Sequence, residues 1–270
     1  MSVPYERILL ATEHGEFDAG AERVAFGLAS RWGVPLAAVL PLVTNAEYEA
    51  VAPALAERAD RDAHERLERL AAAARAAGAT LDTAVRRDAE AWRAIVAETL
   101  ERRAGLVIAR RRGRTGFLAQ RLVGDMVGRV AMQAPCDVLL VPRAAAAWSR
   151  GVLAAVDDAA TAPAVASTAA RIASHDRLPL WLAGIAGHAG PDGGTRAMQA
   201  AVEAGVEARR TAPPAAAPEA IGGIAAASGA DLIVVGRHGH RGALERLMPS
   251  STAEKVIGHA DCAVLVARNA

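Results

Sequence analysis

The chain has 270 residues, of which 52% are hydrophobic and 23% are charged, and its formal net charge at pH 7 is +1. This near-neutral balance excludes a general attraction to polyanions, so we expect no nucleic-acid partner. No apolar run reaches roughly 20 residues, the length of a membrane span, and the N-terminus lacks the basic start and cleavage site of a signal peptide. Two cysteines, Cys136 and Cys262, fit a reducing compartment, so we expect a cytoplasmic protein with no membrane partner.

The first half of the chain alternates short apolar runs with segments of helical period. Apolar runs of this kind predict strands that are covered on both faces, because neither side of the run is polar. The predicted strands are Ile8–Thr12, Leu36–Val43, Leu81–Arg86, Leu106–Ala109 and Val138–Val141. The predicted helices are Ala19–Trp32, Glu47–Ala77, Ala89–Arg103 and Gly124–Met132.

The second half repeats this alternation. Strands that alternate with helices predict right-handed crossovers and a parallel, doubly wound α/β sheet in each half. The predicted strands are Val152–Val156, Leu180–Ile185, Val206–Arg210, Leu232–Val235 and Ala263–Val266. The predicted helices are Pro163–Ser174, a short remnant at Thr195–Ala204, Pro218–Ser228 and Thr252–His259.

An internal repeat explains the similarity of the halves. Ala104–Val141 aligns without a gap with Ala230–Ala267, 126 positions later, while Arg7–Glu13 aligns with Gly151–Asp157 at an offset of 144. The difference means that the second copy lacks about 18 residues of the long helix Glu47–Ala77. We therefore expect two tandem domains of one fold, 1–143 and 151–270, called here the first and the second copy.

The segment between the copies is the predicted linker, Arg143–Arg150, and its Trp148 is expected to pack against a domain. The long helix of the first copy carries charges spaced for i,i+4 pairs, which is typical of a solvated face. These charges are Glu57, Arg58, Arg61, Glu65 and Arg69.

A glycine loop follows the fourth strand of the second copy. Gly236-Arg237-His238-Gly239 is followed, nine residues later, by Pro249-Ser250-Ser251-Thr252 at a predicted helix start. Glycines let the backbone approach an anion, and the N–H groups of a helix N-terminus point toward negative charge, so the pattern is compatible with a phosphate site. The alternative is that the glycines only shape a loop and the hydroxyls only cap the helix.

These residues resemble the universal stress protein family, whose nucleotide-binding members carry a G-x2-G-x9-G-(S/T) loop after the fourth strand and an Asp at the end of the first strand. The resemblance covers nearly the whole chain. It implies a tandem member with two Rossmann-like, adenine-nucleotide α-hydrolase-like domains, paired as a pseudo-dimer through their fifth strands, with a further homodimer open. It also implies an adenine nucleotide as the ligand: ATP, with AMP, ADP and an accompanying Mg²⁺ left open.

The binding residues that the resemblance implies lie in the second copy. Asp157 falls on the ribose- or base-contacting Asp, and Ile185 on the apolar residue that flanks adenine. The phosphate contacts fall on Gly236, Arg237, His238, Gly239, Ser250, Ser251 and Thr252.

The sequence departs from the family pattern at Pro249, where the family has Gly. Proline removes one N–H donor and fixes φ near −65°, which predicts weakened phosphate binding. The first copy departs further, because Glu13 replaces the Asp, Arg110 replaces the first loop glycine, and Asp125 adds a carboxylate. We expect the first copy not to bind ATP.

Three functions remain open at this stage. The first is a regulatory stress protein that binds an adenine nucleotide in its second copy. The second is a tandem stress protein that binds no nucleotide and acts as an interaction scaffold. The third is a slow ATP-hydrolysing enzyme. The sequence shows no catalytic residue and no nucleophile motif, and its seven histidines and two cysteines do not have the spacing of metal ligands.

Overall fold

The computed structural model describes residues 3–111, 126–156, 161–185, 193–237 and 252–268. The chain forms two compact units, and each is described by itself. One unit is Tyr5–Ala147, which holds the first copy; the other is Trp148–Ala270 with Met1–Pro4, which holds the second copy. Among the described residues, no helix combines the length and the hydropathy needed to cross a membrane.

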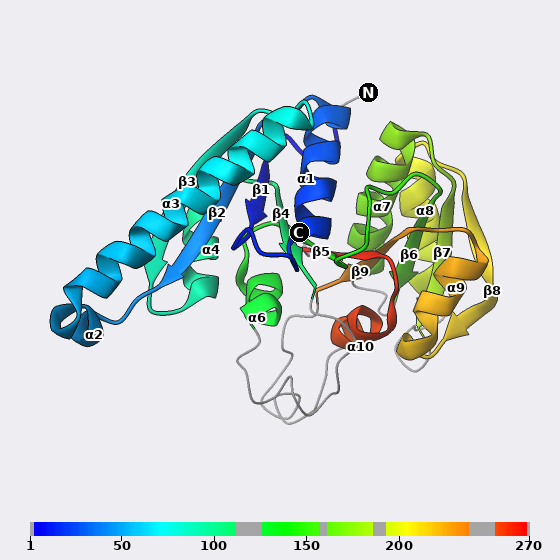
Figure 1. The fold of residues 1–270 in the computed structure, drawn as a ribbon. Coiled ribbons are helices and arrows are strands. Elements are labelled where there is room, and N and C mark those ends of the chain that lie inside the picture. The colour runs from blue at the N-terminus through cyan, green and yellow to red at the C-terminus, as the bar shows by residue number, and fades with distance from the viewer. Residues whose placement is uncertain (1–2, 112–125, 157–160, 186–192, 238–251, 269–270) are drawn as a thin grey trace. The chain divides into compact units, whose positions relative to one another are not determined.

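The first copy contains a parallel five-stranded sheet in the order β3-β2-β1-β4-β5 (Figure 1). Its chain order runs outward from β1 to β3 and then returns through β4 to β5, so the expected doubly wound topology is confirmed. Its strands are β1 Ile8–Ala11, β2 Leu36–Val43, β3 Leu81–Asp88, β4 Leu106–Arg110 and β5 Asp137–Val141.

Helices cover both faces of this sheet, because right-handed crossovers in opposite directions place them on opposite sides. The described helices are α1 Ala19–Trp32, α2 Ala46–Val51, α3 Pro53–Ala76, α4 Ala91–Glu101 and α6 Met126–Gln133. The single helix expected over Glu47–Ala77 is wrong. Pro53 stands at the first position of α3, and Ala52 before it is non-helical (φ −133°, ψ 61°), because the ring of a proline disfavours a helical residue in front of it.

The second copy repeats the sheet in the order β10-β9-β6-β7-β8. Its strands are β6 Val152–Val156, β7 Leu180–Ile185, β8 Ala208–Ala216, β9 Leu232–Gly236 and β10 Ala263–Ala267. Its helices are α7 Ala162–Asp176, α8 Gly193–Glu203, α9 Ile221–Ala227 after the 3₁₀ turn η1 Pro218–Ala220, and α10 Thr252–His259. Thus α8, with 11 residues, stands where the first copy has α2 and α3, as the repeat offsets predict.

The segment that joins the two units is anchored rather than free. Trp148 is 1% exposed, and its Nε1 donates to Asp176 Oδ2 at 2.8 Å, which confirms that this tryptophan packs against a domain. The carboxylate of Asp231 accepts the backbone N–H groups of Ser149, Arg150 and Gly151 at 2.9–3.2 Å. One side chain therefore satisfies three successive backbone donors just before β6 begins.

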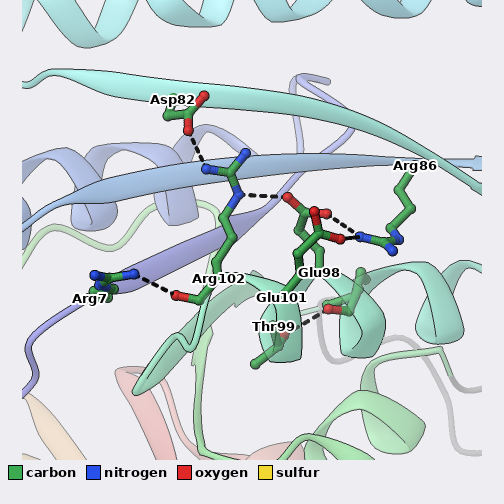
Figure 2. A network of polar contacts seen from close by, with 8 residues as sticks. Arg7, Asp82, Arg86, Glu98, Thr99, Glu101 and Arg102 are labelled. Atoms are coloured by element: carbon green, nitrogen blue, oxygen red, sulfur yellow. Dashed lines mark hydrogen bonds and ion pairs between the residues drawn. The ribbon is translucent and has the colours of Figure 1, made fainter.

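A network of charged side chains joins α4 to β3 in the first copy (Figure 2). The nearly buried carboxylate of Glu98 accepts from Arg86 Nη1 and from Arg102 Nε, both at 2.6 Å. Arg86 also pairs with Glu101, and Arg102 with Asp82. Because each buried charge has an opposite charge beside it, the network holds the helix against the edge strand without leaving an uncompensated ion.

Close backbone packing in the first copy predicts that Gly20→Ala is destabilising. A Cβ on Gly20 would lie 2.1 Å from the carbonyl oxygen of Pro142 and 2.7 Å from that of Arg143, so α1 would have to move. We expect a loss of about 1–3 kcal/mol in the free energy of unfolding, measured by urea denaturation.

The matched control is Gly27→Ala on the same helix, where the added Cβ would meet only the Ala147 side chain at 3.5 Å. This variant should be neutral or gain up to about 1 kcal/mol from helix propensity. Equal losses in the two variants would contradict the packing explanation.

Candidate functional site

The candidate site of each copy lies where its strand order reverses, at the carboxyl ends of β1 and β4 in the first copy and of β6 and β9 in the second. In a doubly wound sheet this switch point is where ligands bind, because the neighbouring loops diverge there. The chain leaves β4 and β9 in the same way: Arg111 N donates to Val141 O at 2.7 Å, and Arg237 N donates to Ala267 O at 2.9 Å. The first residue after each of these strands therefore makes the same backbone hydrogen bond in both copies.

In the first copy, the switch point is occupied by an arginine and its counter-charges. Arg110 ends β4, and its guanidinium lies 3.4 Å from the carboxylate of Glu13 and 3.6 Å from that of Asp18. Its side chain is 17% exposed and that of Asp18 only 1%. An arginine whose charge is already neutralised in this way has little electrostatic attraction left for a phosphate.

A second group of polar side chains completes the first-copy site. Glu22 of α1 accepts a hydrogen bond from Thr12 Oγ1 at 2.9 Å, and its Oε1 lies 3.0 Å from Nδ1 of His14. The N–H of Gly15 donates to Asp18 Oδ2 at 2.9 Å. Burial raises the pKa of Asp18, while the Gly15 N–H and the Arg110 guanidinium oppose that rise. The loop between β1 and α1 is thus held by its own hydrogen bonds.

The second copy carries small, uncharged residues at the equivalent positions. By the offsets of the repeat, Asp18 and Glu22 correspond to Ala162 and Ala166, and Arg110 corresponds to Gly236. Both alanines are fully buried on α7, and Gly236 ends β9. None of these three residues places a counter-charge at the second switch point, so a bound anion would meet no carboxylate from them.

Gly236 also has a packing role. A Cβ at this position would lie 3.1 Å from Cγ2 of Val165 and 3.4 Å from Oγ1 of Thr161, both at the start of α7. In the first copy the residue equivalent to Val165 is Ala21, which is smaller and fully buried. The exchange of Val165 and Gly236 for Ala21 and Arg110 keeps the helix against the strand end in both copies.

Four of the predicted site residues fall in the described part of the chain. Ile185, at the carboxyl end of β7, is fully buried; Gly236 is buried at the end of β9; Arg237 is half-buried beside it; and Thr252, 7% exposed, begins α10. The others lie outside the described residues: Asp157, His238, Gly239, Ser250 and Ser251. The described residues contain no group of three or more His, Cys, Asp or Glu side chains able to hold a metal ion.

Sequence reasoning missed the polar group around Asp18 and Glu22. Both residues sit at the beginning of α1, where acidic residues are ordinarily explained by the helix dipole. The signal was available in the repeat, because two acids and an arginine are exchanged together for two alanines and a glycine.

Comparisons with known proteins identify the family. The sequence profile of the Universal stress protein family matches residues 4–142 and again 149–268, so the chain belongs to this family as a tandem member. No curated sequence matches the chain significantly.

Solved structures agree with the fold. A universal stress protein from Archaeoglobus fulgidus DSM 4304 superposes with a TM-score of 0.75 at 17% identity, covering 99% of this chain and 97% of its own. A putative universal stress protein from Pseudomonas aeruginosa UCBPP-PA14 has a TM-score of 0.66 at 22% identity, covering 98% of this chain and 93% of its own.

The raised pKa of Asp18 predicts a pH-dependent stability difference between the wild type and Asp18→Asn. The folded state holds the Asp18 proton to a higher pH than the unfolded chain, whose aspartate has the ordinary value of 3.8. The favourable contribution of this group is therefore full below the unfolded pKa and is lost as the pH rises through the folded pKa. Asparagine does not titrate, so Asp18→Asn should improve relative to the wild type as the pH rises through this window. Urea denaturation at a series of pH values measures the difference, and a difference that is constant with pH would contradict the assignment.

The two roles of Gly236 can be separated by a pair of substitutions. Gly236→Ala should cost about 1–3 kcal/mol of unfolding free energy through the contact with Val165, and Val165→Ala in the same chain should relieve that part. If Gly236 serves packing alone, the double variant binds ligands as Val165→Ala does. A binding defect that persists in the double variant would assign the glycine to the ligand.

Proposed function

We propose that this protein is a regulatory stress protein that binds an adenine nucleotide in its second copy. The observation that supports this proposal is the exchange at the switch point, where Asp18, Glu22 and Arg110 give way to Ala162, Ala166 and Gly236. The first copy neutralises its own charges there. The second copy leaves its anion-binding backbone without competing carboxylates from these positions.

In this proposal Asp157, which follows β6 in sequence, binds the ribose or the base, and Ile185 forms the apolar wall beside adenine. The phosphates are bound by Gly236, Arg237, His238 and Gly239 and by the hydroxyl-bearing start of α10. Thr252 begins that helix of eight residues, whose N–H groups provide positive potential. ATP is the favoured ligand, with AMP and ADP as lower-charge alternatives and Mg²⁺ as the counter-ion of the phosphates.

The first copy then serves as architecture. Its Arg110 pairs with Glu13 and Asp18, and these two carboxylates occupy the guanidinium in place of a phosphate. Pairing of the two copies through their fifth strands, and a further homodimer, stay predictions of the family resemblance.

Pro249 supports a second candidate function, an interaction scaffold that binds no nucleotide. A proline at this position withholds one N–H from the phosphates, a loss of about 1.5–3 kcal/mol for a charge-assisted hydrogen bond. That corresponds to a ten- to hundredfold weaker affinity, which reduces binding without abolishing it. Slow ATP hydrolysis is a third candidate function.

Calorimetric titration with ATP tests the favoured function. The wild type should bind, and Asp157→Ala should weaken the affinity by about tenfold or more, because a charged hydrogen-bond acceptor is lost. Glu13→Ala, at the equivalent position of the first copy, is the matched control and should leave the affinity unchanged. Absence of binding heat in the wild type would remove the nucleotide function and leave the scaffold.

Restoring the family residue extends this test. Pro249→Gly should tighten ATP binding by about ten- to hundredfold if the loop is a weakened phosphate site. Release of ADP during prolonged incubation, lost in Asp157→Ala, would instead support the hydrolytic function.

A further inference from the structure

A pocket in the second copy lies away from the switch point. It has a volume of about 450 Å³, which is within the range of pockets for small molecules. It lies between helix α9 and the strands β7 and β8, which end the sheet on that side. Its lining residues are Trp181, Arg210, Thr211, Ala220, Gly223, Ile224, Ala227 and Ser228.

The equivalent positions of the first copy carry charged side chains. By the 126-residue offset, Ile224, Ala227 and Ser228 correspond to Glu98, Glu101 and Arg102, the centre of the ion-pair network (Figure 2). Trp181 corresponds to the buried Ala37, at the 144-residue offset. Where the first copy has paired charges, the second has short side chains and one indole.

The indole of Trp181 lines the pocket and is not part of the fully buried core. Trp181 is half-buried, and a Cβ on Gly151 would lie 2.3 Å from its Cζ3, so the glycine leaves space for one edge of the ring. The indole makes no hydrogen bond to any residue that the structure describes. Two small residues of α9, Gly223 and Ala227, also line the pocket.

The second copy also has an arginine, Arg209, at a position where the first copy has an acid. Arg209 is the in-register neighbour of Trp181, so its side chain leaves the sheet on the same face. The register partner of Ala37 in the first copy is Asp82, which pairs with Arg102. In the second copy the acid has become Arg209 and the arginine has become Ser228, and Arg209 is exposed with no ion pair among the described residues.

Arg210 does not supply this charge. Its Nη2 lies 3.8 Å from the position of a Cβ on Gly194, at the start of α8. Its guanidinium is therefore on the opposite face of the sheet, although Arg210 is one of the residues that line the pocket. Arg209 is not one of the lining residues, but its side chain leaves the sheet on the same face as Trp181, next to the pocket.

We propose that this pocket binds a small planar aromatic carboxylate. The ring stacks on the Trp181 indole, and the carboxylate pairs with Arg209, with the Ser228 hydroxyl as a further donor. This pocket is separate from the proposed nucleotide site, so neither proposal depends on the other.

The test uses the full-length protein labelled with ¹⁵N-tryptophan, whose four indole signals belong to Trp32, Trp92, Trp148 and Trp181. The probes are 2-naphthoate and its neutral analogue 2-naphthamide, and Trp181→Phe assigns the signal. We expect 2-naphthoate to shift the Trp181 signal, with the other three unmoved, and to bind at least tenfold more tightly than the amide, because only the acid gains a charge-assisted contact.

Arg209→Ala should weaken 2-naphthoate binding by about tenfold, while binding of the amide stays unchanged. The matched control is Arg196→Ala, which removes an equally exposed arginine from α8 on the other face of the sheet. Asp157→Ala should have no effect, which separates this site from the nucleotide site. An unmoved Trp181 signal, or equal affinities for acid and amide, would overturn the proposal.

Discussion

Burial of the parallel strands between two layers of helices is the constraint on which both copies depend. The innermost strands β1 and β6 have no polar side chain, since each is covered on both faces and any charge there would be desolvated. Within the strands, charged side chains are therefore found only at the strand ends and on the edge strands β3 and β8. The candidate sites of both copies accordingly lie at strand ends, and the ion-pair network and the pocket lie at the edge strands β3 and β8.

At the switch points, the described residues of the two copies differ in charge. The first copy buries Asp18 against Arg110 and a backbone N–H, and these contacts offset part of the cost of desolvating the carboxylate. The second copy avoids that cost with alanine and glycine.

The edge strands show the same division. In the first copy, α4 is held to β3 by arginines and acids whose charges compensate one another. In the second copy the corresponding charges are absent or reversed, and the space is an open pocket beside Trp181. The pocket, and an Arg209 with no ion pair to any described residue, thus stand in the second copy where the first copy has its ion-pair network.

The sequence by itself determined the class of fold, the tandem repeat and most of the elements, because buried strands and amphipathic helices impose their periods directly on the chain. Ala19–Trp32 and Leu36–Val43 were predicted to the residue. Pro53 also indicates the break between α2 and α3, but the helical period continues on both sides of it and favours one helix. Only the tertiary structure decided which polar residues meet, since Arg110 reaches Asp18 through the sheet order rather than through any sequence spacing. The same holds for Gly236 against Val165 and for Arg209 beside Trp181: contacts between distant segments depend on strand register and helix packing, which no local pattern encodes.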